Sequence, residues 1–120
     1  MTSKLNLAVE LQQFHGTENY YKHSLIKNIH YTDGVKYMAE TANAYWLIDL
    51  VASYQTESKI RDQHFQVYSL KVNDDKTAKV TITDGNDNVL ASQEIEFTDF
   101  PIDEISIWCV DGIILLPSEY

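Results

Sequence analysis

Cysteine, proline and glycine are scarce in this chain of 120 residues, which contains one, two and four of them. A single cysteine, Cys109, excludes an internal disulfide and suits a reducing compartment. The 44% of hydrophobic residues predicts a packed core rather than a disordered chain. Long apolar runs are missing, because the longest, residues 44–52, contains Asp49 and falls short of a membrane span. We expect a single domain over residues 1–120, and a cytoplasmic protein, since the N-terminus also lacks a signal-peptide pattern.

Basic residues are the other deficit, with nine Lys and Arg against eighteen Asp and Glu. Residues 61–120 hold twelve of the acids and four of the bases, whereas residues 1–60 are nearly balanced. This charge disfavours direct contact with nucleic acid or a membrane surface, because both repel an acidic protein. It favours a protein partner with a basic surface or a nucleic-acid-binding groove.

The first half of the chain predicts two helices. Apolar residues recur at helical spacing after Ser3, which can cap a helix that Gly16 ends. A longer helix is predicted over residues 34–54, where an apolar stripe continues into AYWLIDLVA. Residues 16–33 follow neither period, so we expect an irregular connection there.

The second half alternates apolar and polar residues, which is typical of half-buried strands. The predicted strands cover residues 65–72, 78–83, 89–97, 105–110 and 113–116. Turn residues separate them, and Asp111–Gly112 is typical of a two-residue type I′ hairpin. We therefore predict an α+β fold in which two N-terminal helices pack on a five-stranded antiparallel meander sheet.

Many of the acids lie in turns, where backbone chemistry explains them. The acids that turns explain less well are Glu94, Glu96, Asp99, Asp103 and Glu104. Glu94 and Glu96 are predicted on one strand face about 7 Å apart, close to the phosphate spacing of a nucleic-acid strand. These five carboxylates, with Tyr20 and Tyr21 as aromatic anchors, are the predicted partner-binding residues.

An enzyme is the alternative hypothesis, and it is placed in the loop of residues 15–33. This loop is rich in His, Tyr and acidic residues, namely His15, Glu18, Tyr21, His23, His30 and Asp33. The histidine spacings match no zinc-ligand motif, so we assign no metal, no cofactor and no catalytic residue. Asp49 is predicted either on a solvent-facing stripe of its helix or paired with a base such as Arg61, rather than as a buried acid.

Four segments of the chain resemble a family of small bacterial and mobile-element proteins with a domain of unknown function. They are FHGTENYYKH and YTDGVKYMAETANAYWLIDLVA within residues 14–54, and FTDFP and ILLPSEY within residues 97–120. The resemblance implies no activity, but its setting suggests by analogy an inhibitor of host defence, such as an anti-CRISPR protein. Our leading hypothesis is thus a non-enzymatic binding protein that mimics nucleic acid, and a homodimer through the apolar helix face is a further option.

Overall fold

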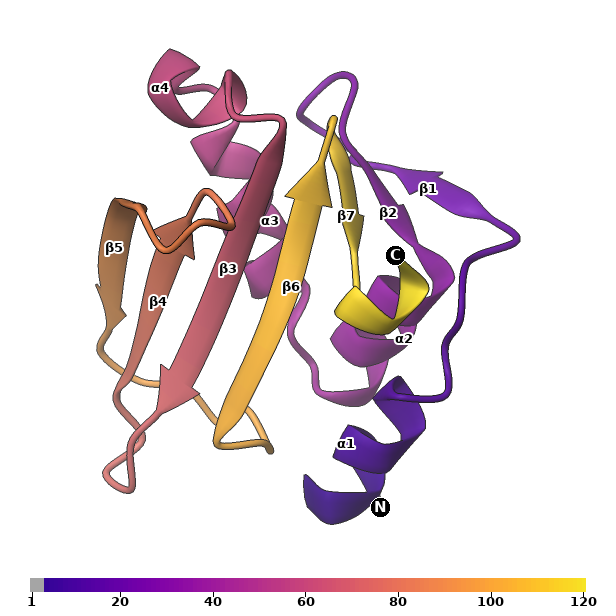
Figure 1. Cartoon of the computed structure of the whole chain (residues 1–120). Helices are drawn as coiled ribbons and strands as arrows, with labels where there is room; N and C mark the ends of the chain where they lie inside the picture. The colour runs from indigo at the N-terminus through magenta and orange to yellow at the C-terminus, as the bar shows by residue number, and fades with distance from the viewer. Residues whose placement is uncertain (1–3) are drawn as a thin grey trace.

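The computed structural model describes residues 4–120 as a mixed sheet with its main helices on one face (Figure 1). The helices are α1 Lys4–Leu11, α2 Asp33–Thr41, α3 Tyr45–Tyr54 and α4 Ser58–Arg61, and a 3₁₀ turn, η1 Pro117–Glu119, follows at the C-terminus. The strands are β1 Tyr20–Lys22, β2 His30–Thr32, β3 Phe65–Val72, β4 Ala78–Thr83, β5 Val89–Ile95, β6 Glu104–Val110 and β7 Ile113–Leu115. The α+β class is confirmed, whereas the proposed cap Ser3 lies outside the described residues.

The predicted five-stranded antiparallel meander is wrong. Within residues 4–120 the sheet has seven strands in the order β1-β2-β7-β6-β3-β4-β5, and β2 runs parallel to β7. After β5 the chain crosses the end of the sheet and adds β6 on the far side of β3 (Figure 1). The two strands differ in what they can bury: β6 carries Ile105, Ile107 and Cys109 toward the core, whereas β5 is mostly exposed. The more apolar strand therefore takes the central place.

The helix predicted over residues 34–54 is divided in two. Asn43 has φ +53°, a left-handed conformation that ends α2 and that asparagine tolerates better than most residues. The amide of Ala44 donates to the carbonyl of Ala39, 2.8 Å away, which closes the helix end. The break lets α2 and α3 follow different directions over the sheet, so both bury apolar faces.

Residues 16–33 contain two short strands instead of the irregular connection that was predicted. β1 pairs antiparallel with β2, and His30 and Tyr31 of β2 pair with Ile113 and Ile114 of β7. Strands of three residues are too short to show a period in sequence. Their position depends on β7, which is more than 80 residues further along the chain.

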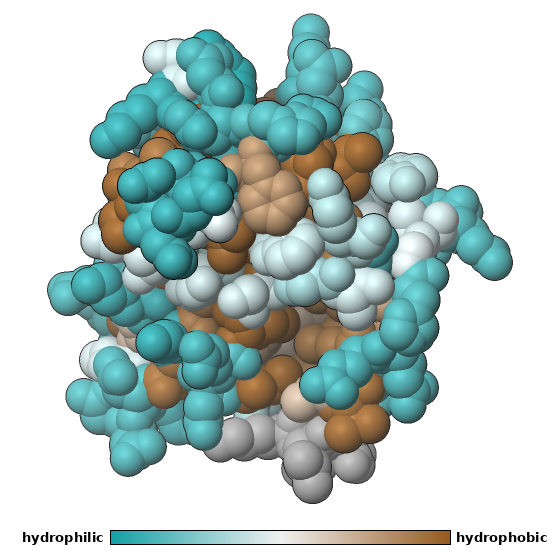
Figure 2. All heavy atoms as spheres, in the orientation of Figure 1, coloured by the Kyte–Doolittle hydropathy of each residue, from teal (hydrophilic) through white to brown (hydrophobic). Residues whose placement is uncertain are grey.

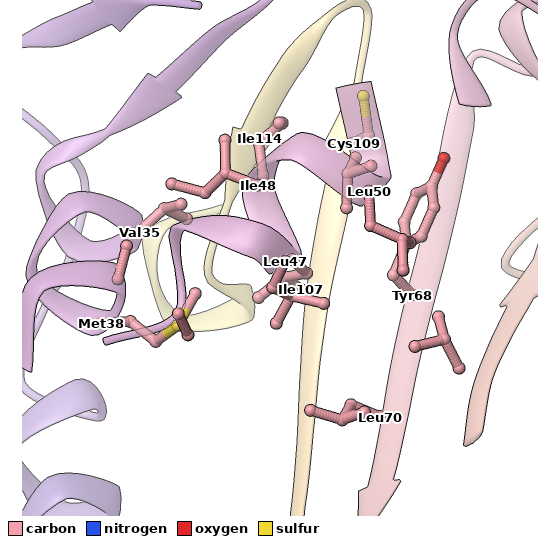
Figure 3. Packing of buried hydrophobic residues seen from close by; sticks show 14 of the residues in the cluster. Val35, Met38, Leu47, Ile48, Leu50, Tyr68, Leu70, Ile107, Cys109 and Ile114 are labelled. Atoms are coloured by element: carbon pink, nitrogen blue, oxygen red, sulfur yellow. The ribbon is translucent and has the colours of Figure 1, made fainter. Parts of the chain in front are cut away.

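The core lies between the sheet and helices α2 and α3 (Figure 3). Met38, Leu47 and Ile48 of the helices meet Tyr68 and Leu70 of β3 and Ile107 of β6 there. Cys109 is buried in the same layer, and its burial raises the pKa of the thiol to about 12, so the thiol stays protonated. Within residues 4–120, every helix is too short or too polar to cross a lipid bilayer.

Candidate interaction surface

The outer face is the side of the sheet that points away from α2 and α3 and toward the viewer in Figure 1. Strand pairing arranges its side chains in rows that run across the strands. At one end, Glu104 of β6 pairs with Lys71 of β3, Lys71 pairs with Lys79 of β4, and Lys79 pairs with Glu94 of β5. We call these four residues the charged row. Directly paired residues lie about 5 Å apart and share a face, so two lysines separate the two glutamates.

The neighbouring row carries hydroxyl groups. It consists of Ser106, Ser69, Thr81 and Ser92, in register across β6, β3, β4 and β5. The hydroxyl oxygens of Ser69 and Ser106 are 3.4 Å apart. Figure 2 shows the result as a pale band of intermediate hydropathy across the middle of this face. This row carries no ionisable group, so the middle of the outer face is uncharged.

An aromatic cluster lies at the other end of the outer face. Phe65 of β3 and Trp108 of β6 have ring centroids 4.8 Å apart. Tyr120 packs edge-on against both, at 5.7 Å from Phe65 and 5.4 Å from Trp108. Tyr120 remains 71% exposed, so the cluster presents an aromatic surface to solvent. Exposed, rigid aromatic groups are frequent anchors of protein interfaces.

The five predicted contact carboxylates are divided between strands and a loop. Glu94 and Glu104 lie at the two ends of the charged row. Glu96 follows β5, which ends at Ile95, so Glu96 lies on the connection after the strand rather than within the predicted strand of residues 89–97. Asp99 and Asp103 lie with it on the connection of residues 96–103, and all five residues are exposed.

This connection is fixed to the sheet. The amide of Thr98 donates to the carbonyl of Lys76 at 2.9 Å, and the amide of Val72 donates to the carbonyl of Asp103 at 2.7 Å. The side chains of Thr98 and Phe100 are buried, which also holds the connection against the rest of the fold. The carboxylates are therefore held on one rigid end of the sheet.

The turn between β3 and β4 adds charge at this same end. We call the acidic end the region made by Asp74, Asp75, Glu94, Glu96, Asp99, Asp103 and Glu104, together with Lys71, Lys76 and Lys79. Hydrogen bonds from the hydroxyl and amide of Thr77 lower the pKa of Asp75, so that carboxylate is ionised. Seven acids against three lysines leave the acidic end negative, although lysines interrupt it.

The two predicted tyrosine anchors lie at the opposite edge of the sheet. Tyr20 is 57% exposed on β1, which is one edge strand of the sheet. The carboxylates of the acidic end lie on and between β5, at the other edge, and β6. The Tyr21 hydroxyl donates to Asp33 Oδ1 at 2.8 Å, and its ring stacks on Tyr31 with centroids 5.6 Å apart. Lys36 Nζ lies 4.4 Å from the centroid of the same ring. Tyr21 is thus engaged within the fold, and the structure does not bring either tyrosine to the carboxylates.

Asp33 organises the loop before β1. Its carboxylate accepts hydrogen bonds from the Tyr21 hydroxyl, the Thr17 hydroxyl and the amides of Glu18 and Asn19. These donors, the Tyr21 hydroxyl first, lower the pKa of Asp33 to about 2. A carboxylate with so many internal donors is a structural group that ties the loop to the start of α2.

Replacing Asp33 by asparagine should destabilise the protein at neutral pH and have little effect near pH 2. The pKa of Asp33 is depressed in the folded state, so its stabilisation is present above about pH 4 and is lost as the pH falls to about 2. Thermal melts of wild type and variant at pH 6, 4, 3 and 2 measure this. Asp62→Asn, at an exposed position, is the control. A gap in melting temperature that stays constant with pH would contradict the assignment.

His23 is buried, and both of its ring nitrogens are engaged. Nδ1 accepts the amides of Leu25 and Ile26 at 3.1 and 3.0 Å, so the proton resides on Nε2, which donates to Asp49 Oδ1 at 2.8 Å. Asp49 is 68% exposed on α3, which agrees with the predicted solvent-facing stripe, although its partner is His23 rather than Arg61. His23 has no free lone pair with which to act as a base.

The other two histidines of the alternative site do not join His23. His15 is exposed in the loop after α1. His30 lies on β2, where its amide donates to the carbonyl of Gly112, in the turn before β7. Among the described side chains, no group of three His, Cys, Asp or Glu could hold a metal ion.

A histidine–carboxylate pair that the sequence did not indicate lies at the end of the molecule near α4. His64 Nδ1 lies 2.5 Å from Asp111 Oδ1, and the Asp111 amide donates to the His64 carbonyl at 3.2 Å. The pair borders a pocket of about 390 Å³ that also reaches Arg61 and Lys27. The Asp111–Gly112 turn was predicted, and both residues have positive φ, but nothing in the sequence indicated that His64 lies beside it.

The fold and this surface define a class of protein, a small α+β domain with one open sheet face bordered by acidic loops. The chain belongs to DUF6876, a family of unknown function whose model matches residues 5–120. Searches of curated proteins and of solved structures found no match.

Proposed function

We propose that this protein is a non-enzymatic binding protein that engages a basic protein surface in the cytoplasm. The observation that carries the proposal is the acidic end, where loop carboxylates stand on a rigid edge beside an open, partly aromatic sheet face. Fixed charges of one sign speed the encounter with a partner of opposite sign, and an uncharged surface next to them supplies contact area.

The strand register supports the loop carboxylates as the proposed contact residues. Glu94 and Glu104 each lie next to a lysine in the charged row, which weakens their field. Glu96 and Asp99 are on the connection and belong to no such row. Mimicry of a nucleic-acid strand would therefore depend on the loop carboxylates, and an anti-CRISPR role stays a prediction based on analogy.

Reversing the loop charges should slow binding to a basic partner. For Glu96→Lys combined with Asp99→Lys, we expect association slower by on the order of tenfold at low salt, with the difference shrinking as salt is added. Partners are captured from host cytosol on immobilised wild type, and their binding is then measured by surface plasmon resonance.

The matched control reverses Glu57 and Asp62 near α4, at the opposite end of the molecule (Figure 1). A competing 20-base-pair DNA duplex tests whether the partner's site is a nucleic-acid groove. Partners that bind both reversed proteins equally would overturn the proposal.

The alternative function, an enzyme built on residues 15–33, receives less support from the geometry. His23 is occupied on both nitrogens and Asp33 is held by hydrogen bonds to its own loop. An acid–base role would fit His64 better, because its Nδ1 bonds to Asp111 and its side chain, 69% exposed, borders the pocket of about 390 Å³.

A further inference from the structure

β5 forms one edge of the sheet. It pairs with β4 along its length, and within residues 4–120 no strand lies on its other side. An edge strand of seven residues presents a row of backbone N–H and C=O groups that can pair with another extended chain. The other edge, β1, is three residues long and offers far less.

The usual protections of an edge are weak in β5. Residues 89–95 contain no proline and no lysine, and the one irregularity in the pairing falls at its start, between Ile82 and Thr83 of β4. Apolar side chains are exposed at the first residue of β5, Val89, which is 65% accessible, and two residues beyond its end, at Phe97, which is 70% accessible. The edge is thus open to an added strand along most of its length.

The two faces of β5 would meet different side chains of an added strand. On the outer face, Ser92 and Glu94 end the hydroxyl row and the charged row. On the inner face, Ala91 and Ile95 are partly buried against the core. Because side chains alternate along a strand, a complementary segment would place basic residues on one face and apolar residues on the other.

Charge favours a basic occupant over a second copy of the chain. Residues 84–99, which comprise β5 and its flanking turns, contain five carboxylates and no lysine or arginine. Two copies paired edge to edge would bring these carboxylates together, whereas a Lys- or Arg-rich segment would neutralise them.

We propose that β5 binds an extended segment of a partner protein as an additional strand, and that this segment alternates Lys or Arg with apolar residues. The inference rests on the proposed function, since it names how the basic partner would be held. Backbone pairing would supply affinity and the carboxylates would supply selectivity.

The test uses an eight-residue peptide of alternating Lys and Val, blocked at both ends, with the isotope-labelled full chain. We expect its NMR titration to shift the amides of residues 89–95 and to slow their hydrogen exchange. Two further peptides carry N-methyl groups on all Lys or on all Val residues, so each has methyl groups on one edge of the strand. Strand pairing predicts that one of the two binds at least about tenfold more weakly while the other is little changed.

Equal binding of both methylated peptides, or shifts outside β5, would overturn the inference. A dimer whose association is lost in Ser92→Pro, with no peptide binding, would overturn it in favour of a second copy. The proposed function is tested by a different result: it is wrong if captured partners bind the variant with Glu96 and Asp99 reversed as well as they bind wild type. The two results are therefore distinguishable.

Discussion

Replacing Glu119 by alanine is expected to lower the free energy of unfolding by about 3 kcal/mol. The carboxylate is buried and accepts the Thr32 hydroxyl at 2.6 Å, the Leu116 amide at 2.9 Å and the Gly34 amide at 3.2 Å. Alanine would leave these buried donors without an acceptor. Chemical denaturation followed by tryptophan fluorescence measures the loss.

Glu119→Gln separates charge from hydrogen bonding. Its amide could still accept on one side, but its NH₂ would face a donor on the other, so an intermediate loss is expected. Glu57→Ala, at an exposed position beside α4, is the control for a lost surface charge. A loss below about 1 kcal/mol for Glu119→Ala would contradict the assigned role.

The same contact explains why position 34 is glycine. A Cβ there would lie 2.7 Å from Glu119 Oε1 and 2.7 Å from Leu116 Cδ1, closer than either atom allows. Gly34 thereby lets the start of α2 approach the C-terminal turn.

Replacing Tyr68 by alanine is expected to cost about 4 kcal/mol, because among residues 7–120 it is the largest fully buried side chain and lies at the centre of β3. Its hydroxyl donates to Gln66 Oε1 at 2.6 Å and accepts from Gln55 Nε2 at 2.8 Å. Burial raises the pKa of Tyr68, so the phenol stays neutral at all ordinary pH values. The free energy of unfolding from denaturant titration measures the effect.

Tyr68→Phe divides this cost between packing and hydrogen bonding. It removes the hydroxyl alone, and about 1 kcal/mol is expected. Gln55 and Gln66 still bond to each other at 2.8 and 3.0 Å, so the network is reduced rather than destroyed. Tyr20→Phe, on an exposed tyrosine, should be neutral. Equal losses for the Phe and Ala variants would show that the cavity is not the main cost.

The strands of the second half could be predicted within about two residues, because alternation reports which side chains face the core. Alternation does not report which strand lies beside which. The placement of β6 next to β3 therefore escaped prediction, and with it the charged row, since Lys71 faces Glu104 in this order alone.

The elements of the first half were harder to predict, because one depends on a single residue and another on a strand far along the chain. Asn43, set between two alanines, was the single sign that the long helix divides. β2 pairs with β7, which lies near the other end of the chain, and no pattern within residues 16–33 indicates this pairing. The concentration of carboxylates in residues 94–104 is visible in the sequence, whereas the hydrogen bond between Tyr21 and Asp33 is not, because it joins residues from two different elements, β1 and α2.

The crossing of the chain between β5 and β6 affects how the sheet assembles. β3, β4 and β5 can form as successive hairpins through short turns, and these contacts are local. The pairing of β3 with β6 joins residues such as Phe65 and Val110, so it requires closure of a much longer loop. We therefore expect the β3–β4 and β4–β5 hairpins to form first. The pairing of β3 with β6, which completes the core, is expected to form in a slower, later step.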